Sequence, residues 1–167
     1  MTIATLLDAL YATGLAEQIR ENELAFPAVE SVHVLAITLV VGSIAAFDLR
    51  LLGWASRDRA VSRLAADVLP VTWAAFGVAA ASGLLMFASN APKYFDNVYF
   101  RGKLVLLALA GLNMLVFQFV VRRDPGAWDT GPAVPRAARL AAALSLLLWT
   151  LVVAAGRWIG FTMLAGY

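Results

Sequence analysis

The sequence predicts an all-α integral membrane protein, a bundle of four transmembrane helices preceded by a short N-terminal interfacial helix. Of its 167 residues, 62% are hydrophobic and only 14% are charged, whereas a soluble domain carries roughly 25% charged residues. Four separate stretches are each apolar over about the 20 residues that a helix needs to cross a bilayer. These stretches use more than half of the chain, so we expect residues 1–167 to form a single membrane domain.

The N-terminal segment is predicted to form an interfacial helix over residues 2–20. Ile3, Leu6 and Leu10 fall on one side of such a helix, while Asp8 and Glu17 fall elsewhere. This pattern is typical of a helix that lies in the membrane surface. The segment lacks a basic region, so it does not resemble a cleaved signal peptide.

The four spans are predicted from apolar stretches bounded by charged or loop-forming residues. Pro27 suits the first turn of the first span. The second span carries Ala75, Ala79 and Gly83 at a four-residue spacing that lets another helix approach closely. Between the second and third spans, the aromatic side chains of a connecting loop suit the membrane interface. The predicted bounds are 27–53, 67–89, 101–121 and 137–164.

The basic residues predict the orientation. Eight of them fall on one side of the predicted bundle: Arg50, Arg57, Arg59, Arg63, Arg122, Arg123, Arg136 and Arg139. Five fall on the other side: Arg20, Lys93, Arg101, Lys103 and Arg157. By the positive-inside rule, we expect a multi-pass protein of the bacterial inner membrane with both termini outside.

Composition also narrows the function. The chain has no cysteine, which excludes disulfides, thiolate metal sites and cysteine nucleophiles. A net charge of +2 is too small and too scattered to indicate nucleic-acid binding, so the expected surroundings are the lipid bilayer. The sequence suggests neither a Ser-His-carboxylate set nor a phosphate-binding loop. We therefore expect a redox component at most, rather than an enzyme.

Ionisable residues cluster at the predicted outer ends of the spans. Such groups cost about 2.5–3.5 kcal/mol each at a helix centre, so they usually face the bundle interior and often mark function. Glu30 and His33 lie one turn apart on the first span, and the helix directions bring Lys103 and Arg157 to the same level. Asp48 lies about 22 Å further along the first span. There, beside Arg50, we expect it to be near water and to need no special role.

The outer cluster suggests a haem b site. His33 is the single histidine of the chain, and an imidazole is a common axial ligand of haem iron. Haem propionates are anions that favour nearby cations, which Lys103, Arg101 and Arg157 would supply. This hypothesis describes a cofactor protein that binds haem near the outer membrane surface and passes electrons.

One histidine supplies only one axial ligand, so the haem hypothesis needs another. The second ligand would be Met86, at a similar depth on the second span, or the partner's His33 in a homo-oligomer. Glu30 would accept a hydrogen bond from the imidazole and fix its tautomer. A divalent metal held by His33 and Glu30 is a related option, although two ligands make an incomplete site.

Two further functions stay open on the sequence alone. The stripe from Glu30 to Asp48 could line the route of a small proton or metal-ion transporter or channel. Small residues on the first span, such as Ser31, Thr38 and Gly42, instead offer docking surfaces for an accessory subunit of a larger membrane complex. Asn113 and Gln118 are expected to form hydrogen bonds between helices.

Two stretches carry a resemblance to a known family. They are FPAVESVHVLAITLVVGSIAAFDLRLLG and GLLMFASNAPKYFDNVYFRGKLVLLALAGLNMLVFQF. Their most specific pieces are Glu30-x-x-His33, Asp48-Leu49-Arg50 and the segment from Phe100-x-x-Lys103 to Asn113. The sequence resembles an uncharacterised family of small four-helix bacterial inner-membrane proteins, and more distantly the copper-resistance D-type membrane proteins. The nearer resemblance implies no known activity, and the more distant one implies metal handling across the membrane.

Overall fold

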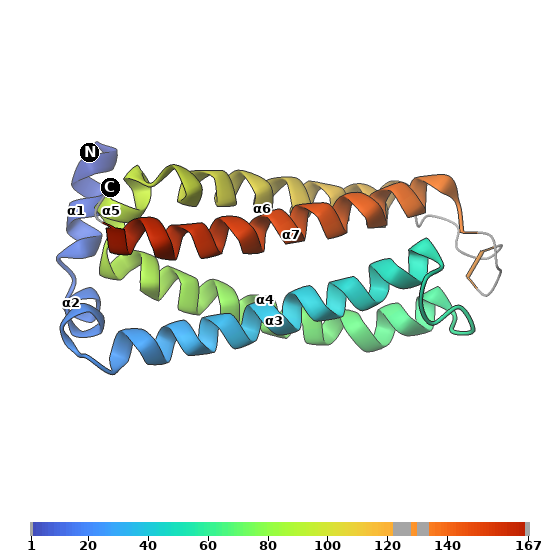
Figure 1. The fold of residues 1–167 in the computed structure, drawn as a ribbon, viewed down its shortest axis with the longest axis horizontal. Helices are drawn as coiled ribbons and strands as arrows, with labels where there is room; N and C mark the ends of the chain where they lie inside the picture. The colour runs from blue at the N-terminus through green and yellow to red at the C-terminus, as the bar shows by residue number, and fades with distance from the viewer. Residues whose placement is uncertain (1, 122–127, 130–133, 166–167) are drawn as a thin grey trace.

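The protein is an all-α bundle, which confirms the predicted fold class (Figure 1). The computed structural model describes residues 2–121, 128–129 and 134–165. Its four long helices are α3 (Ala25–Leu52), α4 (Val61–Ser89), α6 (Val98–Val116) and α7 (Arg136–Ala165), and α6 continues as the π-helical segment η1 (Phe117–Val121). Three short helices are α1 (Ile3–Tyr11), α2 (Gly14–Glu21) and α5 (Ala91–Asp96).

Each long helix can span a bilayer. The 28 residues of α3 extend about 42 Å at 1.5 Å per residue, more than the hydrocarbon core of about 30 Å. Four candidate spans follow from length and hydropathy: Ala25–Leu52, Val61–Ser89, Val98–Phe119 and Arg136–Met163. Many of their large apolar side chains are exposed on the outside of the bundle, as a lipid environment requires. The chain is therefore a multi-pass membrane protein.

The helices extend beyond the apolar stretches that predicted them. Helix α4 begins at Val61 rather than residue 67, because Asp129 caps its first turn through the backbone N–H and the hydroxyl of Ser62, both at 2.7 Å. Helix α6 begins at Val98 rather than residue 101, because the Asn97 side chain caps it. Hydropathy marks the part of a helix that lies in the hydrocarbon, whereas capping side chains mark its end.

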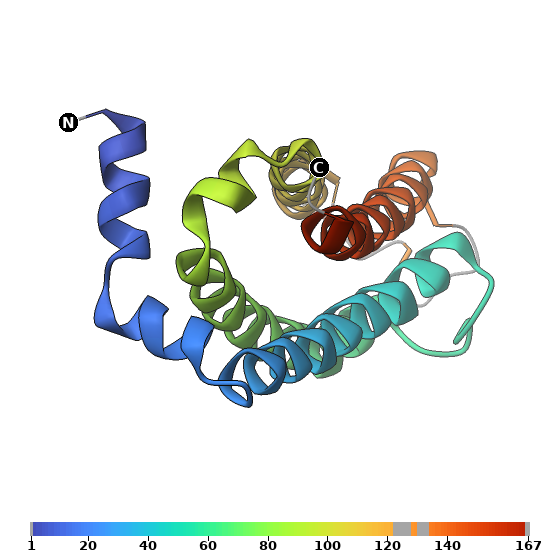
Figure 2. The same ribbon diagram turned by 60° about the vertical axis from the view of Figure 1, so that its left-hand side comes forward.

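Two expectations about short segments are wrong. The single interfacial helix predicted over residues 2–20 is two helices, because Thr13 ends the first one and caps α2 by accepting a hydrogen bond from the Ala16 N–H. The loop expected after α4 contains α5. Helices α1 and α5 lie against each other, and α2 packs on α4 and α3. These short helices therefore gather at one end of the bundle (Figures 1 and 2).

The long helices pack as two antiparallel pairs. Helix α3 packs along α4, α6 packs along α7, and α3 also contacts α7. Over the described residues, α4 and α6 make no extended contact. Ala75 and Ala79 are buried, as expected for small residues that allow close helix packing.

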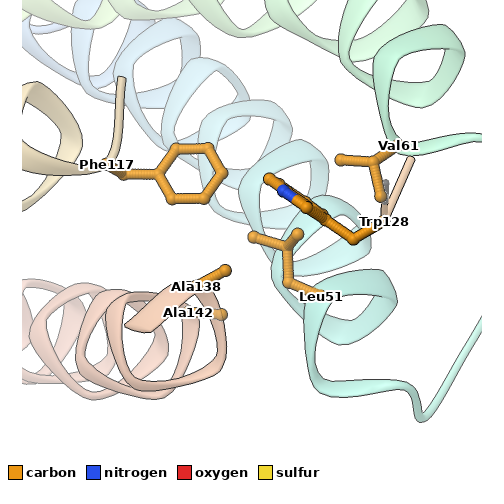
Figure 3. Packing of buried hydrophobic residues seen from close by; sticks show 6 residues of the cluster. All are labelled: Leu51, Val61, Phe117, Trp128, Ala138 and Ala142. Carbon is orange, nitrogen blue, oxygen red and sulfur yellow. The ribbon is translucent and has the colours of Figure 1, made fainter. Parts of the chain in front are cut away.

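A buried apolar cluster closes the end of the bundle opposite the short helices. It joins α3, α4, η1, α7 and the connection before α7 through Leu51, Val61, Phe117, Trp128, Ala138 and Ala142 (Figure 3). The Trp128 side chain is 7% exposed. We call this the loop end of the bundle, and the end that carries α1, α2 and α5 the short-helix end.

Candidate functional site

The sequence-predicted cluster lies at the short-helix end, where α3 and α6 begin and α4 and α7 end. His33 is half-buried between α3 and α4. Its Nδ1 lies 3.0 Å from the Ser82 hydroxyl oxygen, and its ring packs against the backbone of Gly83. A Cβ atom at position 83 would lie 2.9 Å from Cε1 of the imidazole. Glycine at this position therefore makes room for the ring.

Helix α4 holds the His33 ring through Ser82 and the backbone. The Ser82 hydroxyl lies within hydrogen-bond distance of the Val78 and Ala79 carbonyls, at 2.7 and 3.2 Å, as well as of the imidazole Nδ1. The Ala79 backbone also accepts a hydrogen bond from the ring. The orientation of the imidazole is therefore fixed from the α4 side.

The structure brings Lys103 towards His33. Lys103 is half-buried on α6 and its charge acts on the imidazole. Its Nζ lies 3.6 Å from where a Cβ of Gly156 would be, so the small residue on α7 leaves room for the ammonium group. Met86 is also half-buried, one turn beyond Ser82 on α4. Of the three cations expected near the imidazole, Lys103 is therefore the one that the structure brings towards it.

Glu30 and the two arginines are arranged differently from the expected cluster. All three side chains, those of Glu30, Arg101 and Arg157, are exposed. The Arg157 guanidinium lies 4.7 Å from the centroid of the Phe161 ring on its own helix. Over the described residues, the only ion pair joins Arg59 and Asp67 at 2.8 Å, so Glu30 and Arg157 do not neutralise each other.

Tyr94 joins this end of the bundle, although the sequence offered no reason to select it. Helix α5 places its ring 5.6 Å from that of Phe100 and 6.3 Å from that of Phe87, and the residue is 9% exposed. Burial raises the pKa of the Tyr94 phenol, and the negative charge of Glu30 raises that pKa further. The negative charge of Glu30 therefore acts on a buried phenol of α5.

A second site lies towards the loop end, inside the bundle. The expectation that Asp48 and Arg50 lie near water is wrong, because their side chains are only 5% and 2% exposed. The Arg50 Nε donates to the Arg59 carbonyl at 2.8 Å, while its Nη2 has no partner. The Ser145 hydroxyl of α7 lies beside the Asp48 carboxylate. The Asp48 Oδ2 is buried and has no hydrogen-bond partner.

Asp48 lines a cavity of about 200 Å³ between the four long helices. The wall is mainly apolar and aromatic: Phe47 of α3, Trp73 and Phe76 of α4, Phe117 of η1 and Trp149 of α7 contribute to it. Phe47 and Phe117 meet edge to face with their centroids 5.8 Å apart. The sequence could not reveal this cavity, because no periodicity predicts where two helices fail to meet.

Other polar groups of the wall hold the helices together. Asn113 of α6 donates to the Ala141 carbonyl of α7 at 3.0 Å, which confirms its expected role between helices. Thr72 of α4 and Ser43 of α3 share a hydrogen bond of 2.8 Å. These groups form hydrogen bonds within the bundle. Among the buried polar atoms of the described cavity wall, the Asp48 Oδ2 is the one without a hydrogen-bond partner.

Metal binding by the acidic and histidine residues gains no geometric support. Over the described residues, no group of three or more His, Cys, Asp or Glu side chains could hold a metal ion.

A second, wholly apolar groove lies on the outside of the α3–α4 pair, lined by Val32, Leu35, Ala36, Leu39, Val71, Ala74, Ala75 and Val78.

The fold and these sites define a multi-pass membrane protein built as a four-helix bundle with a buried carboxylate in an internal cavity. Residues 24–162 match a family described as a family of unknown function, DUF6644. Because the match spans most of the chain, the protein belongs to this family, and the expected membership of an uncharacterised family is confirmed. No curated protein and no solved structure matches the chain.

Proposed function

We propose that the protein binds a small, largely apolar molecule inside its helix bundle, with Asp48 as the polar anchor. The observation that carries this proposal is the cavity of about 200 Å³ whose wall contains a buried carboxylate oxygen without a partner. A buried polar atom without a hydrogen bond costs roughly 1–3 kcal/mol. A ligand that supplies the missing donor recovers that free energy on binding.

The size of the cavity limits the ligand. An engineered protein cavity of about 150 Å³ lined by apolar side chains accepts benzene. The cavity beside Asp48, at about 200 Å³, therefore suits one aromatic ring or an aliphatic molecule of similar volume. Its aromatic wall favours edge-to-face or offset contacts with such a ring.

The bilayer is the expected source of the ligand. Trp73 and Phe76 on the α4 side of the wall are 54% and 40% exposed, and Met114 on the α6 side is 37% exposed. Because α4 and α6 make no extended contact over the described residues, the wall reaches the lipid-facing surface between them. An apolar molecule dissolved in the bilayer would enter there without crossing water.

Filling the cavity tests the proposal. Gly111 of α6 lines the cavity, and a Cβ added there meets nothing within 4 Å, so position 111 accepts a side chain and Gly111→Leu is designed to occupy ligand space. Gly102 lies on the same helix, has equal room and is not part of the wall. Propylbenzene should change the tryptophan fluorescence of the detergent-purified protein, and of Gly102→Leu, in a saturable manner. Gly111→Leu should lose that response, whereas equal responses from both variants would contradict the proposal.

Haem b binding at His33 is the second candidate. The hydrogen bonds that orient the His33 ring and the nearby Lys103 favour it, because a metal-bound histidine commonly has its other ring nitrogen hydrogen-bonded to a fixed partner. The second axial ligand would be Met86 or the partner's His33, the latter requiring a homo-oligomer. Protein produced with a haem precursor should show a Soret band that His33→Ala removes, and colourless protein that takes up no hemin would exclude this candidate.

The proposal also covers the membrane in which the protein lies, the orientation of the chain in that membrane, and its partners. We propose an inner-membrane location with both termini outside, which would place the short-helix end at the outer surface. A role in metal handling, which the distant resemblance to copper-resistance D-type proteins implies, stays a prediction, as do ion passage and assembly into a larger complex.

A further inference from the structure

We infer that the cavity selects a cationic ligand, namely a primary ammonium group carried on a single aromatic ring. This inference rests on the proposed function, because it names the chemical class of the molecule in the same cavity. Three features of the wall carry it: the unpartnered carboxylate oxygen of Asp48, the absence of an ion pair between Asp48 and any described cation, and the aromatic residues around it.

Asp48 selects for a donor. An ionised carboxylate only accepts hydrogen bonds, and the Ser145 hydroxyl occupies one side of the group while Oδ2 lacks a partner. A ligand N–H or O–H that lies against Oδ2 supplies a hydrogen bond to the carboxylate. A wholly apolar ligand supplies none.

Charge balance favours an ammonium group over a hydroxyl group. Asp48 forms no ion pair in the described parts of the chain, and the buried Arg50 two residues further along directs its Nε to the Arg59 carbonyl. An isolated buried carboxylate is costly, and a partner of opposite charge offsets that cost. An ammonium ligand supplies a donor and the counter-charge together.

The wall also suits the rest of such a molecule. Phe47, Phe117 and Trp149 approach from three elements and provide ring faces and edges. Aromatic faces attract cations as well as other rings. With about 200 Å³ available, one ring and a chain of two carbons fit together with the ammonium group, which makes 2-phenylethylammonium the matching probe.

The test compares 2-phenylethylammonium with propylbenzene, in which a methyl group replaces the ammonium group at nearly the same volume. Both are titrated at neutral pH into the detergent-purified full chain by calorimetry. The inference predicts that the wild-type protein binds the ammonium probe at least about tenfold more tightly than propylbenzene. Asp48→Asn, which keeps the shape, should remove this preference. Asp58→Asn, at an exposed position outside the cavity, should retain it.

Each outcome decides a different question. Binding of propylbenzene without preference for the ammonium probe would overturn the inference and leave the proposed function standing. An equal loss of both ligands in Asp48→Asn would also overturn it, because Asp48 would then only maintain the fold. Failure of the wild-type protein to bind either probe would overturn the proposed function itself.

Discussion

Replacing Gly83 by alanine would place a methyl carbon 2.9 Å from Cε1 of His33, closer than packed carbon atoms come. The imidazole would have to turn away from α4 and lose its 3.0 Å hydrogen bond to Ser82. Leaving a favourable rotamer costs about 0.5–1.5 kcal/mol, and an interhelical hydrogen bond in a membrane protein contributes about 0.6 kcal/mol. Alanine also favours the helix by about 0.5–1 kcal/mol over glycine at either position, so we expect Gly83→Ala to have a free energy of unfolding about 1–2 kcal/mol lower than that of a Gly→Ala change elsewhere on α4.

Thermal unfolding in detergent measures this difference, which corresponds to a few degrees in melting temperature. Gly77→Ala is the matched control, because Gly77 lies on the same helix and a Cβ there meets nothing within 4 Å. In a His33→Ala background, Gly83→Ala should behave like Gly77→Ala, since the clashing ring is gone. Equal melting temperatures for Gly83→Ala and Gly77→Ala with His33 present would refute the packing argument.

Three other predictions concern charge and orientation. Burial raises the pKa of the Tyr94 phenol, and the negative charge of Glu30 raises that pKa further. Glu30→Gln should therefore shift Tyr94 ionisation to lower pH in an ultraviolet titration, and an unchanged titration would show that the charge of Glu30 does not act on Tyr94. Arg157→Ala should change the melting temperature only slightly, because the side chain is exposed and forms no ion pair with a described acidic residue. A large decrease would indicate a buried pair. Cysteine labelling should reach position Ser62 from the cytoplasm and position Asn90 from outside, and the reverse pattern would invert the proposed topology.

Hydropathy predicted the four spans because each is a local property of the chain. The ends of the helices depended on single side chains instead. Thr13 divides the N-terminal segment and Asn97 starts α6, and both types of residue are recognisable as caps. Asp129 caps α4 from a distant part of the chain, so no reading of the local sequence would have found it.

The candidate sites were predicted less completely than the fold. Helix direction and depth were enough to bring His33 and Lys103 together. They did not fix rotation about each helix axis, and the exposed Arg157 lies over the Phe161 ring of its own helix instead of joining the expected cluster. The burial of Asp48 depends on α7, whose Ser145 lies far away in sequence. A cavity is a result of how four helices pack, and therefore has no signature in one of them.

Binding inside the bundle can be tested by locating a bound ligand. Crystals of the protein soaked with bromobenzene would report the ligand by the anomalous scattering of its bromine. We expect a bromine peak inside the bundle, between Asp48 of α3 and Gly111 of α6, and its disappearance in Gly111→Leu. A peak confined to the outer groove beside Leu35 and Val78, with an empty interior, would contradict it.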